Sequence, residues 1–196
     1  MSDVDSSLLK QMFHEARSQN GWSDQPVSDE ALAAAYEIAK WGPTSMNTQP
    51  MRLLFIRSQE AKERLKPALA PGNVDKVMAA PVVAIVAHDS QFHEHLPRLF
   101  PHNPNAPGMF AGNEGLAQAT AFRNGTLQGA YFIIALRAVG LDVGPMSGFD
   151  PAKVDAEFFA GTTFKSNFLC GIGHGDPAKV MGRLPRFELG EISQTL

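Results

Sequence analysis

The stretch from Glu114 to Val139 constrains the fold more than any other part of the sequence, because it is long and contains no proline. Small residues occur throughout it, and large apolar side chains fall on more than one face of a helix: Phe122, Leu127, Tyr131, Phe132, Ile133, Ile134 and Leu136. This pattern predicts a long helix that is buried on several sides. Its glycines would allow another helix to approach closely.

Other runs predict a small sheet surrounded by shorter helices. Pro81 to Ala87 is continuously apolar, which is typical of a strand covered on both faces. Two further strands are expected at Arg52–Arg57 and Asn167–Gly173, with a turn at Gly140–Gly144. Helices are expected at about 6–16, at 60–69 with a break near Pro67, at 73–80 and at 151–159. A further helix is expected to begin after a Ser28 cap and to bury Leu32, Ala35, Tyr36 and Ala39. This order favours one α+β domain over residues 1–196 with helices around a sheet.

The segment from Asp89 to about Asn113 is rich in proline and is expected to be an excursion or lid over a pocket. His88, His93, His95 and His102 lie in or beside it, but without the spacing of metal ligands. We therefore expect solvated surface histidines and no metal site.

Composition excludes several classes of partner. The 196 residues carry 17 basic and 20 acidic side chains, a net charge of −3 without long like-charge runs. This favours neither nucleic acid nor a membrane surface as a partner. The polar, acidic residues Met1 to Asp5 do not resemble a secretory signal, so a cytoplasmic location is expected. The one cysteine, Cys170, lies in an apolar run and is expected in the core.

Three familiar site patterns are rejected. No Gly-x-x-x-x-Gly-Lys-Ser/Thr sequence occurs, which excludes a phosphate loop of that type. Gly171 to Gly175 lacks the last glycine of a dinucleotide fingerprint and is followed by too little chain for a βαβ unit. Ser147 does not have the flanking glycines of a hydrolase nucleophile elbow.

A scattered polar set remains. Its most distinctive part is Gly42 to Pro50, a turn-forming stretch that offers hydroxyl and amide groups without charge. The other parts are Arg17-Ser18, Asn73 with Lys76, Pro145 to Gly148, and Arg183 with Arg186. Together they supply cations for a phosphate, amides and hydroxyls for a polyol and a heteroaromatic edge, and a turn whose backbone N–H groups can approach a ring.

These residues carry a family resemblance. Trp41 to Pro50 resembles the Pro-Ser-Ser-x-Asn-x-Gln-Pro loop of the nitroreductase-like FMN oxidoreductases, and Gly144–Asp150 and Arg183–Arg186 also fit that family. The resemblance covers nearly the whole chain and is greatest to the branch of malonic semialdehyde reductases of pyrimidine breakdown. It implies a three-layer α-β-α fold with a small mixed sheet, and a homodimer with the long helix at its interface.

The resemblance also implies roles for the polar set around FMN bound between two subunits. Arg17, Ser18 and Asn20, with Arg183 and Arg186, would hold the phosphate and ribityl chain. Asn73 and Lys76 would meet the pyrimidine side of the flavin, and the backbone of Pro145, Met146, Ser147 and Gly148 would lie near N5. Pro43, Thr44, Ser45 and Asn47 would come from the other subunit.

Two departures from the family pattern affect these expectations. Ala16 and Asn20 stand where the family often has basic residues, so phosphate binding would depend on Arg17 and the C-terminal arginines. Ser147 stands where better-known nitroreductases have an acid, so a preference for nitro substrates does not simply transfer.

The expected activity is hydride transfer from NADH or NADPH through FMN N5 to a small oxidised substrate, with no side chain needed as general acid. The closest branch implies reduction of 3-oxopropanoate to 3-hydroxypropanoate, and the wider family implies nitroaromatics or quinones. Arg52, Arg98 or Arg123 could pair with a substrate carboxylate. A flavin carrier without turnover and a flavin-free interaction domain are the alternatives from other functional classes.

Overall fold

A computed structural model describes residues 6–196 of the chain, so Met1 to Asp5, whose polarity argued against a signal sequence, lie outside the described residues. Four strands form one sheet in the order β1-β2-β4-β3. They are β1 (Met51–Ile56), β2 (Val82–Asp89), β3 (Asp142–Met146) and β4 (Phe164–Gly173).

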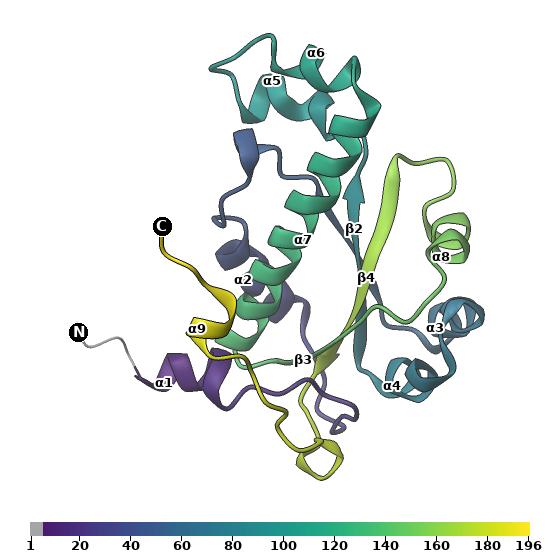
Figure 1. The fold of residues 1–196 in the computed structure, drawn as a ribbon. Coiled ribbons are helices and arrows are strands. Elements are labelled where there is room, and N and C mark those ends of the chain that lie inside the picture. Colours follow the sequence, from purple (N-terminus) through teal and green to yellow (C-terminus); the bar gives the residue numbers. More distant parts are fainter. Residues whose placement is uncertain (1–5) are drawn as a thin grey trace.

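The expectation of a mixed sheet is wrong, because all three strand pairings are antiparallel. The connections explain this. The chain leaves β1 and enters β2 at the same end of the sheet, where Ile56 pairs with Val83. The long helix α7 (Glu114–Ala138) then carries the chain back along the sheet, so that β3 begins beside the end of β4, at Asp142 opposite Gly173 (Figure 1).

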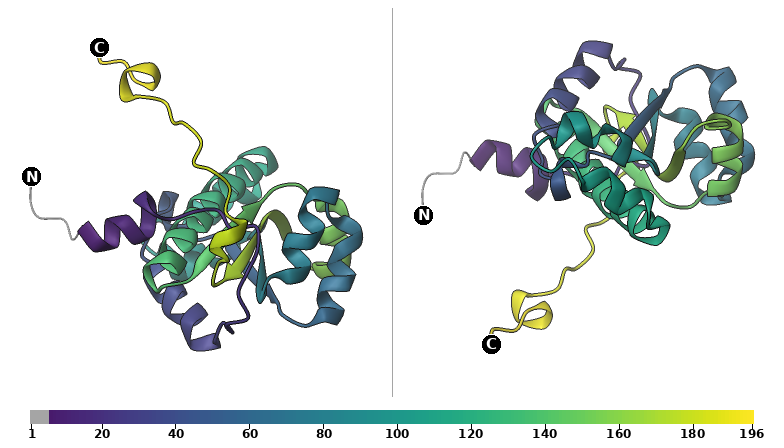
Figure 2. Two further views of the ribbon diagram at one scale, coloured as in Figure 1. Left: turned by 90° about the horizontal axis from the view of Figure 1, so that it is seen from below. Right: turned by 90° about the horizontal axis from the view of Figure 1, so that it is seen from above.

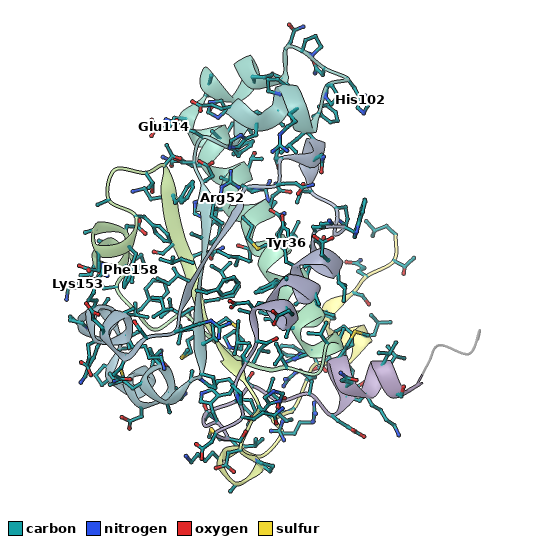
Figure 3. All side chains as sticks on the ribbon, turned by 180° about the vertical axis from the view of Figure 1, so that it is seen from behind. Tyr36, Arg52, His102, Glu114, Lys153 and Phe158 are labelled. Atoms are coloured by element: carbon teal, nitrogen blue, oxygen red, sulfur yellow. The ribbon has the colours of Figure 1, made fainter. Side chains whose placement is uncertain are left out.

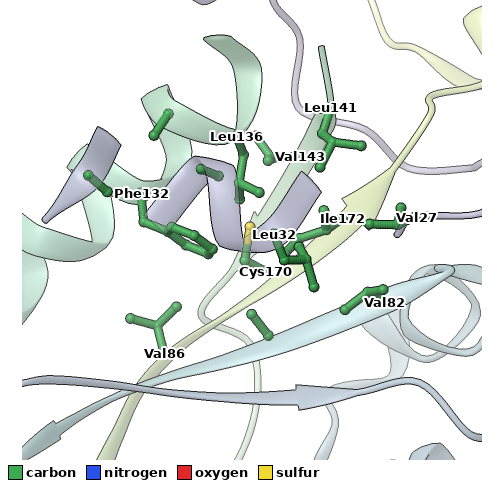
Figure 4. Packing of buried hydrophobic residues seen from close by; sticks show 14 of the residues in the cluster. Val27, Leu32, Val82, Val86, Phe132, Leu136, Leu141, Val143, Cys170 and Ile172 are labelled. Carbon is green, nitrogen blue, oxygen red and sulfur yellow. The ribbon is translucent and has the colours of Figure 1, made fainter. Parts of the chain in front are cut away.

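The sheet is the middle of three layers, as predicted. Helices α2 (Asp29–Ala39) and α7 cover one face, and α3 (Gln59–Leu65), α4 (Val74–Ala79) and α8 (Pro151–Phe158) cover the other (Figure 1). Every residue of β2 is buried, which confirms the predicted central strand. Its side chains alternate between two cores, with Val82 and Val86 in the cluster that also contains Phe132 and Leu136 (Figure 4).

Helix α7 is present nearly as predicted, but in the single chain it is buried along one side only. The buried side includes Ala121, Gly125, Gly129 and Phe132, whereas Phe122 remains 55% exposed. The glycines admit the sheet rather than another helix: a Cβ on Gly129 would lie 2.7 Å from the Phe168 ring. The helix therefore lies close against side chains of the strands at these positions.

Other boundaries differ from the predictions in small ways. The Ser28 cap is confirmed, since its hydroxyl accepts the N–H of Ala31 at 3.1 Å, but Tyr36 of α2 is exposed. The N-terminal helix is α1 (Ser6–Leu9) continued by a π-helical turn (Lys10–His14), and Pro67 ends α3 within a 3₁₀ turn (Lys66–Ala68). Strand β3 occupies a segment that was expected to be a turn.

The proline-rich segment forms short helices at one end of the sheet: a 3₁₀ turn (Phe92–His95), α5 (Leu96–Leu99) and α6 (Ala106–Ala111). Phe92 and Phe110 pack with Ala117 and Ala121 of α7. The expectation that His88 is a surface residue is wrong. It belongs to β2 and is only 9% exposed, because Gly125 of α7 lies directly against it.

The chain ends in an extended tail with little contact to the layers. After a 3₁₀ turn (Pro177–Lys179), the tail projects from the body and carries a short helix, α9 (Leu189–Ile192) (Figure 2). Leu184, Phe187 and Leu189 are each 75% exposed. Within the described residues, no helix has the length and apolar character that a membrane crossing requires.

Candidate functional site

Five of the predicted phosphate-site residues meet around one cavity. Arg17, Ser18, Asn20, Arg183 and Arg186 all line a space of about 460 Å³, which we call the arginine cavity. Its remaining lining residues are Phe13, Ala16, Arg137, Met181, Gly182 and Leu184. Four guanidinium groups and no carboxylate therefore surround the cavity, which makes it suited to an anion such as a phosphate.

The segment before Trp22 is fixed to the end of strand β3. Ser18 forms an isolated parallel bridge with Val143, and the N–H of Gln19 donates to the Val143 carbonyl at 3.0 Å. Gly144 is required here, because a Cβ at that position would lie 2.5 Å from the Gln19 carbonyl oxygen. This contact sets Arg17 and Ser18 beside the sheet.

The C-terminal tail completes the arginine cavity by returning to the N-terminal segment. A guanidinium nitrogen of Arg17 donates to the Met181 carbonyl, and one of Arg183 donates to the His14 carbonyl. Arginines far apart in the sequence are thereby held together through backbone carbonyls, and their charges remain available to a ligand.

The segment from Pro145 to Gly148, here named the Pro145 turn, contains the last two residues of strand β3 and the two residues that follow it. Its last residue is held by the α3–α4 connection: the Gly148 carbonyl accepts the Asn73 side-chain amide at 2.9 Å and the Ala70 N–H at 3.0 Å. A Cβ on Gly148 would come within 2.6 Å of the Asn73 amide nitrogen, so glycine permits this contact. Asn73 and the Pro145 turn therefore form one unit.

Trp22 connects this unit to the arginine cavity. Its indole N–H donates to the Lys76 carbonyl at 3.3 Å, and its ring packs where Gly171 and Gly173 leave space on β4. Lys76 lies on α4, three residues after Asn73, and is half-buried. The predicted groups from 17–20, 73–76 and 145–148 thus all border the part of the sheet where β3 pairs with the last residues of β4.

The segment from Pro43 to Asn47, here named the Ser45 loop, lies elsewhere in the single chain. The Ser45 N–H donates to the side-chain oxygen of Asn124 at 2.8 Å, and the Pro43 carbonyl accepts the Tyr131 hydroxyl at 3.1 Å. Asn124 precedes Arg137 by 13 positions on α7, a rise of about 20 Å at 1.5 Å per residue. One chain alone therefore does not bring the Ser45 loop to the arginine cavity.

The Ser45 loop and the residues just after it have an unusual backbone conformation. Met46, Asn47 and Gln49 have φ angles of 51°, 50° and 40°, a region that non-glycine residues seldom occupy. Such conformations cost about 1 to 3 kcal/mol each and persist only where their surroundings impose them. Here the buried side chains of Asn124 and Gln128 accept backbone N–H groups before and after the strained residues. The structure thus holds the loop in a fixed shape.

Two other candidate residues have structural partners. Arg52 donates to Asp89 at 2.7 Å and its guanidinium lies over the Phe164 ring, so its charge is already matched. Figure 3 labels Arg52 on edge strand β1. Cys170 is fully buried, which confirms its predicted place in the core, and this burial raises the pKa of its thiol to about 12.

Sequence reasoning missed Arg137, which lies in the last turn of α7 and lines the arginine cavity. The only signal was a cation within an otherwise apolar run. A second cavity, of about 700 Å³, lies at the opposite end of the sheet and is lined by residues that include His88, His93, Glu114, Phe122 and Lys165. Part of its lining comes from the proline-rich segment that was expected to lie over a pocket. No cluster of three or more potential metal ligands occurs among residues 6–196.

Comparison with known proteins gives consistent matches. A family model described as the nitroreductase family matches residues 15–174. A Ralstonia pickettii protein with the provisional name NADH dehydrogenase/NAD(P)H nitroreductase HadB is 61% identical over 180 residues, covering 91% of this chain and 92% of that protein. A Cupriavidus pinatubonensis protein of the same provisional description is 57% identical over 189 residues, covering 95% and 96%.

Solved structures match the fold at low sequence identity. A Bacillus subtilis nitroreductase-like protein, ydfN, superposes with a TM-score of 0.87 at 22% identity, covering 97% of this chain and 99% of its own. An Exiguobacterium sibiricum protein solved in complex with FMN gives a TM-score of 0.85 at 20% identity, with both chains fully covered. The predicted nitroreductase-like fold is confirmed.

Proposed function

The chain belongs to the nitroreductase family, and we propose that it is an FMN-dependent oxidoreductase that uses NADH or NADPH to reduce a small organic substrate. The observation that carries this proposal is the arginine cavity beside the Pro145 turn. It provides a cationic site for a phosphate next to a glycine-containing turn that a flat ring can approach.

The residues present fit FMN. The four guanidinium groups of the cavity face no lining carboxylate, which suits the dianionic phosphate, and Ser18 and Asn20 add neutral hydrogen-bonding groups for the ribityl chain. Asn73 and Lys76 would lie toward the pyrimidine edge of the ring. Pro145 and Ser147 are exposed residues, and their backbone would lie near N5.

We infer a homodimer in which the Ser45 loop of one subunit completes the flavin site of the other. In support, the outward side of α7 is an apolar surface lined by Ala119, Phe122, Arg123, Thr126, Leu127 and Ala130. The projecting tail exposes further apolar side chains. A second copy packed on α7 would cover such a surface and supply the loop that one chain holds too far away.

When bound, FMN would supply the redox chemistry by accepting hydride from the nicotinamide and passing it to the acceptor. The protein residues would fix the ring against the Pro145 turn and donate hydrogen bonds to its pyrimidine edge from Asn73 and Lys76. Such donors stabilise negative charge on the ring. No titratable side chain among the predicted ring-binding residues except Lys76 is available for acid catalysis, so orientation is their main contribution.

We propose 3-oxopropanoate as the acceptor, reduced to 3-hydroxypropanoate, on the strength of the resemblance to malonic semialdehyde reductases. The word nitroreductase in the names of the relatives from Ralstonia and Cupriavidus favours a second candidate, a nitroaromatic acceptor, and the resemblance to the wider family adds a quinone. The deciding experiment is steady-state reduction of 3-oxopropanoate, a nitroaromatic and a quinone by the FMN-loaded protein, with NADH and NADPH in turn. A higher kcat/KM for either of the latter acceptors would replace the proposed substrate.

The same preparation distinguishes a reductase from a flavin carrier. Anaerobic NADPH or NADH should bleach the bound flavin within seconds if the protein is a reductase, whereas a carrier would keep its oxidised spectrum. Protein that stays colourless after reconstitution with FMN would contradict both functions.

A further inference from the structure

Arg137 is the member of the arginine cavity that the sequence did not suggest. Its side chain is half-buried in the last turn of α7, where Nη1 donates to the Met12 carbonyl at 3.0 Å. Its Nε is buried and has no hydrogen-bond partner. A buried guanidinium N–H without an acceptor is unfavourable, so a ligand oxygen that reached Nε would relieve an existing cost.

Arg137 also forms no ion pair with another described residue. None of the ion pairs among residues 6–196 involves Arg17, Arg137, Arg183 or Arg186. Burial lowers the pKa of Arg137 against the opposing influence of Cys170 and Asp142, but a guanidinium remains charged at neutral pH. Four like charges around one small space favour a polyvalent anion.

We propose that Arg137 is a phosphate-binding residue of the flavin site, taking the place of the basic residues that Ala16 and Asn20 have replaced in the N-terminal segment. This inference rests on the proposed function. It adds a residue from the core helix α7 to a site otherwise built from the N-terminal segment and the tail. Because α7 is fixed to the sheet, Arg137 would be the pre-organised cation of the set, and the exposed Arg183 and Arg186 would close around the ligand.

Riboflavin, which lacks the phosphate, provides the test. We expect Arg137→Gln to weaken FMN binding about 10- to 100-fold, as the loss of a charged hydrogen bond predicts, and to leave riboflavin binding unchanged. Arg137→Lys should recover part of the FMN affinity, because it keeps the charge but not the planar fork. The control is Arg64→Gln, which removes an arginine of α3 that pairs with Glu157 outside the cavity and should alter neither affinity.

The readouts separate three results. Equal loss of FMN and riboflavin binding in Arg137→Gln would mean that the residue only supports the N-terminal segment through Met12, and would overturn the inference. Unchanged FMN binding in a variant with wild-type circular dichroism would also overturn it. Absence of flavin binding in the wild-type protein would instead refute the proposed function.

Discussion

Asp89 is the most heavily used carboxylate in the described structure, and its partners define a first prediction. It is buried and accepts hydrogen bonds from Arg52 at 2.7 Å, the Thr163 hydroxyl at 2.6 Å and the Gln91 N–H at 2.9 Å. Asp89→Asn would leave the partly buried Arg52 charge unpaired. We expect a loss of about 2 to 4 kcal/mol in the free energy of unfolding, measured by urea titration of the FMN-saturated protein.

Asp29→Asn is the matched control, since Asp29 also pairs with an arginine, Arg57, but its side chain is 88% exposed. An exposed pair contributes about 0 to 1 kcal/mol. Similar effects of the two substitutions would show that burial does not determine the contribution of the Arg52–Asp89 pair.

His88 provides a prediction about pH. Burial lowers its pKa below the usual 6.5, against the opposing influence of Asp155 and Asp89, with Lys165 adding to the decrease. The unfolded chain therefore binds a proton more readily than the folded chain, and stability is lost as the pH falls below 6.5. As the pH falls from 7.5 to 5.5, the free energy of unfolding of His88→Gln should increase relative to that of the wild type, by at most about 1.4 kcal/mol. A difference in unfolding free energy that does not change with pH would contradict this.

At the residue scale, the sequence made Arg17, Ser18 and Arg183 candidates because their chemistry suits a phosphate, and the structure places all three around one cavity. It gave no reason to choose Arg137, whose proposed role depends on where the end of α7 meets the N-terminal segment. His88 was misassigned for a similar reason, since its burial results from Gly125, which is distant in sequence but adjacent in space.

Helix α7 shows how glycines can determine packing between elements. Gly129→Ala would place a Cβ 2.7 Å from Phe168 and 3.2 Å from Val86, so the helix or the sheet must move. We expect destabilisation of about 1 to 3 kcal/mol despite the better helix propensity of alanine. Gly115→Ala lies on the same helix, but its Cβ would be 3.8 Å from the nearest side-chain atom, Asn113 Oδ1, so this substitution should be neutral or stabilising by up to about 1 kcal/mol. Chemical denaturation of both variants tests this, and destabilisation by both would implicate helix backbone effects instead.

Elements with strong local sequence signals were predictable, whereas elements that form only because they pair with another element were not. The Ser28 cap and the apolar run of β2 specify their structures locally. Strand β3 contains Gly144 and Pro145, both unfavourable in strands, and exists because it pairs with β4. The antiparallel direction of the strands likewise depends on the path of α7 across the sheet. The hydrophobic periodicity of the sequence predicts the helix but not this path.

The whole molecule has an apolar exterior along α7 that a single chain leaves uncovered. Leu127 lies on this surface and is 41% exposed. If a second copy packs there, Leu127→Glu should bury a charge in the dimer and shift the protein to monomers, as measured by light scattering. Ala152→Glu, on the outer layer of α8, is the control and should remain dimeric.

Flavin binding should follow the oligomeric state, because the Ser45 loop reaches the arginine cavity only from a second chain in the proposed arrangement. Monomeric Leu127→Glu should therefore bind FMN at least about 10-fold more weakly than wild type, the equivalent of one lost charged or well-formed hydrogen bond per site. A monomer with wild-type FMN affinity would show that one chain suffices for the site, and the strained backbone near Ser45 would then need another explanation. Loss of affinity only in the monomeric variant would connect the fixed shape of that loop to a ligand held by its partner.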